Sequence, residues 1–210
     1  MPPATGQRHT PWMEPVSLTT ERLLLRAPEP GDAAAVHAAC QDPEIPRWTT
    51  VPSPYTRARA EAFACEDSAA GWRDDTAYTF AVLAKDDGAL VGVMSLIRLA
   101  ELHTPRHQAE LGYWTAKEHR GRGYTAEAAR AVCRWAFTDL GVERLEWYAD
   151  VGNDGSRAVA LSTGFHMEGT LRARDVQGGA RRDVWIGSLL PSDWGLAREG
   201  ATPYEPSPRG

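Results

Sequence analysis

Apolar and polar residues follow one another along this chain in two different periods, and the changes of period predict the order of its elements. Short apolar or alternating runs predict strands, and they occupy residues 22–27, 78–84, 89–97, 109–115, 144–151, 166–174 and 182–190. Helical spacing predicts helices over residues 31–41, 56–72, 125–140 and 154–163. Residues 43–54 are proline-rich and predict a loop. Alternating strands and helices with hairpins of neighbouring strands predict a mixed α/β sheet.

Prolines gather at both ends of the chain, in residues 1–16 and again after residue 199. We therefore expect flexible tails at residues 1–16 and 196–210 around a single domain over residues 17–195. A length of 210 residues and a hydrophobic content of 42% suit one well-filled core.

Charge and composition exclude several classes of function. The net charge of −5 argues against a general binder of nucleic acid or anionic membrane, because such binding needs excess Lys and Arg. The sequence has no apolar run of about 18 residues and no signal-like N-terminus, so we expect a cytoplasmic protein. Cys40, Cys65 and Cys133 lie far apart without the paired spacing of a zinc site, so we expect no metal.

A basic, glycine-rich turn joins the strand at 109–115 to the helix at 125–140. Gly121 and Gly123 let the backbone approach a ligand closely, and Arg120 and Arg122 add positive charge beside the first helical turn. A Walker loop is disfavoured because Tyr124-Thr125 follows Gly123, where Lys-Ser or Lys-Thr would be needed. The turn predicts a pyrophosphate site, and a tight turn with two surface arginines is the simpler alternative.

With these residues the chain resembles the GNAT superfamily of acyl-CoA-dependent N-acyltransferases. In that family the loop follows Arg/Gln-x-x-Gly-x-Gly/Ala, and here it is Arg120-x-x-Gly123-x-Thr125. Threonine at the last position is similar to the RimJ/RimL-type branch. The branch's opening strand, Asn-x-x-Ser helix and Gly-Phe-x-x-Glu-Gly turn resemble residues 20–33, 153–156 and 164–169, respectively.

This resemblance implies the GNAT fold and acetyl-CoA as the acyl donor. The fold is a mixed, mostly antiparallel central sheet of about seven strands, flanked by helices and splayed at the acyl-CoA cleft. The loop amides would hold the pyrophosphate, and the neighbouring strand and helix would hold the pantetheine arm. The cofactor-binding residues implied in this way are Tyr113, Trp114, Thr115, Arg120, Gly121, Arg122, Gly123, Tyr124, Thr125, Asn153 and Ser156.

The resemblance also implies catalytic roles. Ser156 would protonate the leaving thiolate, although Asn153-x-x-Ser156 could simply cap a helix. The base that deprotonates the amine could be Asp175 or Glu110, with water, His103 or His107 as further alternatives. A β-bulge at Gly112 would release an N–H for the thioester oxygen, whereas relief of crowding against a tryptophan is the structural alternative.

We therefore expect transfer of acetyl from acetyl-CoA to a primary amine, either a protein N-terminus or a small molecule. Acidic stretches such as Glu66-Asp67 and Asp74-Asp75 are compatible with a cationic acceptor. We expect neither nucleic acid nor membrane as a partner, and a homodimer is compatible with the family. The alternative function is a non-catalytic module that binds or senses acyl-CoA.

Overall fold

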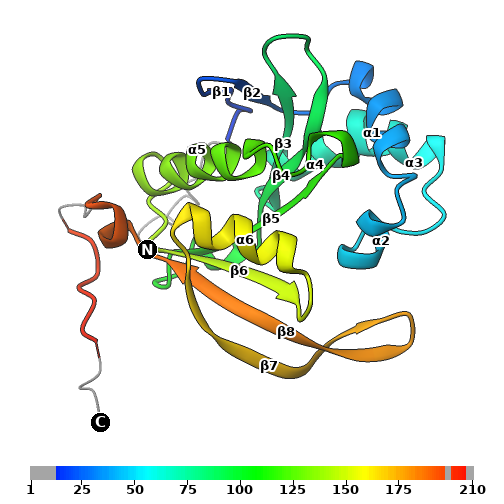
Figure 1. The fold of residues 1–210 in the computed structure, drawn as a ribbon. Coiled ribbons are helices and arrows are strands. Elements are labelled where there is room, and N and C mark those ends of the chain that lie inside the picture. The colour runs from blue at the N-terminus through cyan, green and yellow to red at the C-terminus, as the bar shows by residue number, and fades with distance from the viewer. Residues whose placement is uncertain (1–12, 197–199, 207–210) are drawn as a thin grey trace, which may run out of the picture.

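The computed structural model describes residues 13–196 and 200–206, and within them eight strands form one sheet (Figure 1). The strand order is β1-β2-β3-β4-β5-β6-β8-β7, and all neighbours are antiparallel except β5 and β6. This confirms the mixed, mostly antiparallel sheet. The strands are β1 Leu18–Thr19, β2 Leu23–Arg26, β3 Ala77–Ala84, β4 Leu90–Ile97, β5 Gln108–Thr115, β6 Arg144–Asp150, β7 His166–Gln177 and β8 Ala180–Leu189.

The helices follow the predicted order, with one addition. They are α1 Ala33–Ala39, α2 Glu44–Trp48, α3 Arg57–Ala62, α4 Ser68–Arg73, α5 Tyr124–Thr138 and α6 Asp154–Thr163. A π-helical turn, Phe63–Asp67, joins α3 to α4, so the helix predicted over 56–72 is continuous but changes its winding. In the described part of the chain no helix is both long and apolar enough to cross a membrane.

Helix α2 corrects the prediction of a loop over residues 43–54. Pro46 lies within the first turn of α2. Backbone N–H groups in a first turn have no acceptor within the helix, so the proline costs no hydrogen bond and does not prevent helix formation. Asp42 stabilises the start of α2 because its Oδ1 accepts a hydrogen bond from the Glu44 N–H at 3.3 Å. Buried Ile45 anchors the helix in a core cluster.

The central strand β3 is covered on both faces. Phe80 packs with Trp72 of α4 and Trp135 of α5 in an aromatic cluster with ring centres 5.3–5.9 Å apart. Ala81 and Leu83 belong to a second buried cluster with residues of α1 and α3. Since successive side chains of a strand point to opposite faces, these two clusters place helices on both sides of the sheet.

Strands β5 and β6 separate part-way along their length. They pair from Gln108 to Glu110 of β5 only, although β5 continues to Thr115 and β6 continues to Asp150. The edge of β5 beyond Glu110 therefore has no strand partner on the β6 side. This separation is the predicted splay of the sheet.

The bulge predicted at Gly112 was wrong. Pairing of β4 with β5 runs without a register shift from Gly92–Thr115 to Ile97–Glu110. The alternative of crowding against a tryptophan was also wrong, because a Cβ on Gly112 would meet only Ile97 Cδ1, at 3.9 Å. The hydrogen bonds between β4 and β5 therefore continue past Gly112 without the extra residue that a bulge would insert.

The predicted tails lie largely outside the described residues, which omit 1–12, 197–199 and 207–210. Of the described positions in those segments, Met13, Val16 and Leu196 pack against the main core. Residues 200–206 form no helix or strand.

Close packing of β4 on β5 makes Gly92 the most size-restricted glycine of the sheet. A Cβ at this position would lie 2.2 Å from the backbone oxygen of Trp114. We expect Gly92→Ala to destabilise the protein by about 3 kcal/mol, because backbone cannot move aside as a flexible side chain can. Gly112→Ala is the matched control in chemical or thermal unfolding and should change stability by less than about 1 kcal/mol. Equal losses in both variants would contradict this account.

Candidate active site

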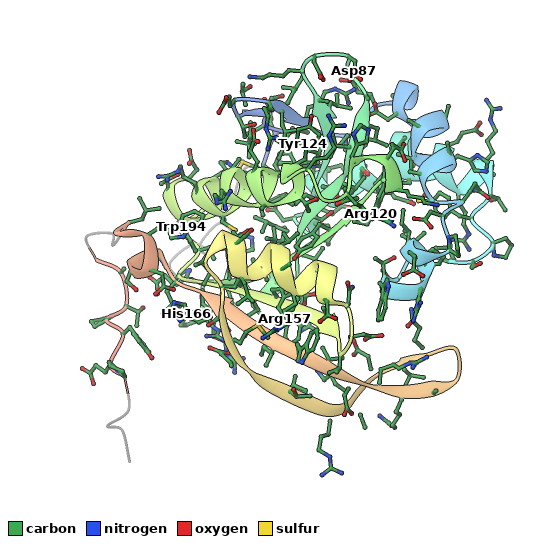
Figure 2. The ribbon with its side chains drawn as sticks, viewed as in Figure 1. Asp87, Arg120, Tyr124, Arg157, His166 and Trp194 are labelled. Carbon is green, nitrogen blue, oxygen red and sulfur yellow. The ribbon has the colours of Figure 1, made fainter. Side chains whose placement is uncertain are left out.

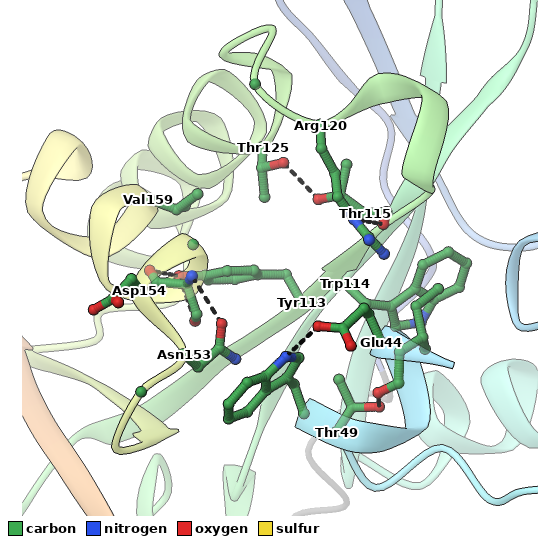
Figure 3. Close-up of a pocket in the computed structure, with 16 residues that line it drawn as sticks. Glu44, Thr49, Tyr113, Trp114, Thr115, Arg120, Thr125, Asn153, Asp154 and Val159 are labelled. Carbon is green, nitrogen blue, oxygen red and sulfur yellow. Dashed lines mark hydrogen bonds between the residues drawn. The ribbon is translucent and has the colours of Figure 1, made fainter. Parts of the chain in front are cut away.

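A cleft of about 400 Å³ opens where β5 and β6 separate. Its walls come from residues 44–49 around α2, 113–115 of β5, 120–125 of the glycine-rich turn, and 152–159 around the start of α6. Figure 3 shows Asn153 and Glu44 on opposite sides of this cleft, with Arg120 and Thr125 along its upper side. Figure 2 shows Arg120 before α5, on the side where α2 lies.

The structure brings most of the predicted cofactor residues to this cleft. Those that line it are Tyr113, Trp114, Thr115, Arg120, Gly121, Thr125, Asn153 and Ser156. Arg122, Gly123 and Tyr124 belong to the same turn but do not line the cleft. Arg122 stacks on Tyr124, with its Cζ 4.8 Å from the ring centre, and donates to the Tyr124 hydroxyl at 3.0 Å.

The glycine-rich turn presents unused hydrogen-bond donors. Gly121 and Gly123 have φ values of +72° and +77°, in the left-handed region that favours glycine. Among the described residues, the backbone N–H groups of residues 121–126 find no acceptor. Free N–H groups at the positive end of α5 are the donors that a pyrophosphate requires, so the turn fits coenzyme A.

Arg120 links this turn to α2. Its Nε donates to the backbone oxygen of Thr115 at 3.0 Å, and its Nη2 lies 2.7 Å from Asp42 Oδ2. Asp42 also accepts a hydrogen bond from the Glu44 N–H, so one carboxylate contacts both the arginine and the start of the helix. The guanidinium is thereby fixed at the cleft wall.

Ser156 lies in a directional hydrogen-bond chain. Its Oγ accepts from Trp147 Nε1 at 3.0 Å and donates to the Tyr113 hydroxyl at 3.3 Å. Tyr113 in turn donates to the backbone oxygen of Ser156 at 2.9 Å, and burial raises the pKa of Tyr113. Because an indole N–H can only donate a hydrogen bond, the Ser156 hydroxyl proton points away from Trp147 and toward Tyr113.

Asn153 performs the capping role that the sequence left open. Its Oδ1 accepts from the Ser156 N–H at 3.1 Å, and the same side chain lines the cleft. Trp147 was missed at the sequence level, because a tryptophan in an apolar strand predicts only core. Its 1% exposure agrees with that expectation, while its Nε1 reaches Ser156.

The two candidate bases lie outside the lining of the cleft. Glu110 is the last residue of β5 that pairs with β6. Its side chain is 15% exposed, and its Oε2 lies 3.0 Å from Arg98 Nε. Burial raises the pKa of Glu110, and the nearby Arg98 opposes that shift. Asp175 on β7 is 55% exposed at its side chain, and Arg174 lies 3.8 Å away.

The two candidate histidines have partners elsewhere. His107 Nδ1 is 3.1 Å from the backbone oxygen of Leu102, and His103 Nε2 is 3.9 Å from Asp75. Neither histidine lines the cleft.

Helix α2 contributes residues that the loop prediction missed. Trp48 donates to Glu44 Oε2 at 2.9 Å, and this bond, with a second from Arg47, lowers the pKa of Glu44. Across the cleft, the Trp48 ring approaches Gly152, and Gln177 of β7 donates to the backbone oxygen of Pro46 at 3.0 Å. The β7–β8 hairpin and α2 thus meet beside the cleft (Figure 1).

Comparison with known proteins assigns this architecture. The sequence model of the acetyltransferase (GNAT) domain matches residues 22–166. The chain belongs to this family. The family's acyl donor is acetyl-CoA.

Relatives of this GNAT protein include ribosomal-protein acetyltransferases. Bacillus subtilis YdaF, a candidate ribosomal N-acetyltransferase, is 39% identical over 51% of this chain and 57% of its own. The ribosomal-protein-serine acetyltransferase of Escherichia coli is 32% identical over 50% of this chain and 56% of its own. The match therefore spans just over half the length of these two relatives.

The fold is also that of a solved RimJ structure. Mycobacterium smegmatis RimJ, in complex with CoA-disulfide, superposes with a TM-score of 0.75 over 87% of this chain and 92% of its own, at 23% identity. These matches confirm the resemblance to the RimJ/RimL-type branch.

Proposed function

We propose that the protein transfers acetyl from acetyl-CoA to a primary amine, on a protein N-terminus or a small molecule. The observation that carries this proposal is the continuity of the site: unused N–H groups of the glycine-rich turn and the open edge of β5 line one cleft. Arg120 and the turn would hold the pyrophosphate, and the edge of residues 113–115 would pair with the pantetheine arm.

Transfer requires that the amine nitrogen bond to the thioester carbonyl carbon while the carbon–sulfur bond breaks. We propose that Ser156 donates its proton to the departing thiolate and is reprotonated from solvent; its hydroxyl accepts a hydrogen bond from Trp147 and donates one to the Tyr113 hydroxyl. We propose Glu110 as the base, acting through water, in preference to Asp175. Glu110 sits where β5 and β6 begin to separate, whereas Asp175 is largely exposed.

Two measurements on the purified protein test the proposal. Calorimetry measures acetyl-CoA binding, and thiol release measures turnover with peptide N-termini, amino acids, polyamines and aminoglycosides. Binding with turnover supports the acetyltransferase. Binding without turnover supports a non-catalytic acyl-CoA module, and absence of binding contradicts the proposal.

The raised pKa of Glu110 predicts the acid limb of the pH profile. A base must be unprotonated, so kcat/KM should fall as the pH drops through the pKa of Glu110. Because burial raises that pKa, the midpoint should lie above the value of about 4.3 that is ordinary for glutamate. The profile of the wild type should be compared with that of Glu110→Gln. A limb that persists unchanged in the variant would assign it to another group.

Trp147 is expected to act through Ser156. Trp147→Phe removes the indole donor and should lower kcat by about 3- to 10-fold, the value of one neutral hydrogen bond, without changing acetyl-CoA affinity. In the Ser156→Ala background the same change should have no further effect on kcat. Trp135→Phe is the control, because Trp135 is also buried and packs against Trp72 and Phe80 of the core. Additive losses in the double variant would contradict a role through Ser156.

A further inference from the structure

Two arginines from distant parts of the chain converge on one aromatic ring beside Glu110. Arg98 follows β4, Arg174 lies in β7, and their Cζ atoms are 5.3 and 5.5 Å from the centre of the Tyr148 ring in β6. Arg98 Nε is also 3.0 Å from Glu110 Oε2. The three strand regions thus place two cations next to the proposed base.

Most donors of these two guanidinium groups are unused. Among the described residues, Arg98 has Glu110 as its ion-pair partner, and Arg174 has only Asp175, at 3.8 Å. Their side chains are 50% and 37% exposed. By contrast, nearby Arg144 donates to both Glu146 and Glu168. Arg98 and Arg174 therefore present N–H groups to solvent from positions fixed by stacking.

The backbone around both arginines adopts a conformation that non-glycine residues rarely take. Arg98 has φ of +58° and Ala173, next to Arg174, has φ of +50°. Ala173 is held there by its N–H bond to Asp183 Oδ1 at 2.8 Å and by Arg181, which donates to its backbone oxygen at 3.0 Å. Such strain persists only where surrounding contacts maintain it, and it is concentrated at functional sites.

The other acidic groups around Tyr148 have cations of their own. Glu146 accepts from Tyr148 at 2.8 Å and from Arg144 at 3.1 Å. Asp150 lies near Asp175 and Arg182. Glu110 and Asp175 are the remaining acids: Glu110 contacts Arg98 through one oxygen, and Asp175 lies 3.8 Å from Arg174. The cluster thus retains guanidinium donors for an additional anion.

We infer that Arg98 and Arg174 bind an anionic group of the acceptor, which makes the substrate an amine that carries a carboxylate or phosphate close to its amino group. This inference rests on the proposed acetyltransferase function. A guanidinium presents a planar set of donors that matches these anions. The anion would orient the amine toward Glu110. A polycationic acceptor would be repelled by these two arginines, although Glu110 and Asp175 lie beside them.

Matched acceptors that differ only in this anion test the inference. One pair is a peptide beginning Ser-Asp against one beginning Ser-Asn, and the other is a free amino acid against its amide. The wild type should show kcat/KM at least about 10-fold higher for the anionic member of one pair. The pair that shows this preference identifies the acceptor as a protein N-terminus or as a small molecule.

Arg174→Gln should abolish most of that preference by raising KM for the anionic member, with the neutral member unchanged. Arg98→Gln should do the same but also alter the pH profile, since Arg98 contacts Glu110. Arg172→Gln is the control, because Arg172 is exposed on the same strand. Its acceptor preference should match the wild type.

Equal or faster turnover of neutral amines or polyamines by the wild type would overturn the inference and leave the acetyltransferase intact. An equal loss for both members of a pair in Arg174→Gln would also overturn it. Failure of every amine to release thiol would overturn the proposed function as well.

Discussion

Glu110→Gln is expected to lower kcat by about 10²- to 10⁴-fold, the usual contribution of a positioned general base. Glutamine keeps the shape of the side chain and removes its ability to accept a proton. Because Glu110 lies outside the cleft that would hold the donor, acetyl-CoA affinity should stay within about twofold of the wild type. Steady-state thiol release and calorimetry measure the two quantities separately.

Asp175→Asn distinguishes the two candidate carboxylates. Asp175 is largely exposed and does not line the cleft, so its variant should retain kcat within about threefold. A large loss in Asp175→Asn with little change in Glu110→Gln would assign the base to Asp175 instead. Thermal unfolding of both variants separates these effects from loss of fold.

Arg120→Ala combined with Gly123→Ala is expected to weaken acetyl-CoA binding by about 10²- to 10³-fold. Arg120 would supply a charge-assisted contact to the pyrophosphate, a contribution of about 1.5–3 kcal/mol. Gly123 has φ of +77°, where alanine costs about 1–2 kcal/mol and would shift the free N–H groups of the turn. Calorimetry with acetyl-CoA measures the combined loss.

Lys117→Ala is the matched control for removal of a positive charge near the turn. Lys117 is exposed and does not line the cleft, so affinity should fall by less than about threefold at physiological salt. Unchanged affinity in the double variant would contradict pyrophosphate binding by this turn. A comparable loss in Lys117→Ala would indicate a general effect of net charge.

The sequence determined those parts of the protein that depend on neighbouring residues. Helix α6 has the bounds that its caps predicted, because Asn153 before it and Gly164 after it act within one turn of the helix ends. The glycine-rich turn and α5 could be predicted for the same reason, since the strand, the glycines and the helix follow one another directly in the sequence. The pantetheine edge could be named for the same reason, as residues 113–115 form one segment.

Tertiary structure decided the contacts between segments that are distant in sequence. Propensity predicted a loop where α2 forms, and burial of Ile45 with the hydrogen bond from the Glu44 N–H to Asp42 outweighed it. No pattern in the sequence brought Trp147 to Ser156, or Arg98 and Arg174 to Tyr148. Such contacts depend on strand register and on the separation of β5 from β6. Register is set by pairing across the whole sheet, so local sequence determines which face a side chain takes but not which partner it meets.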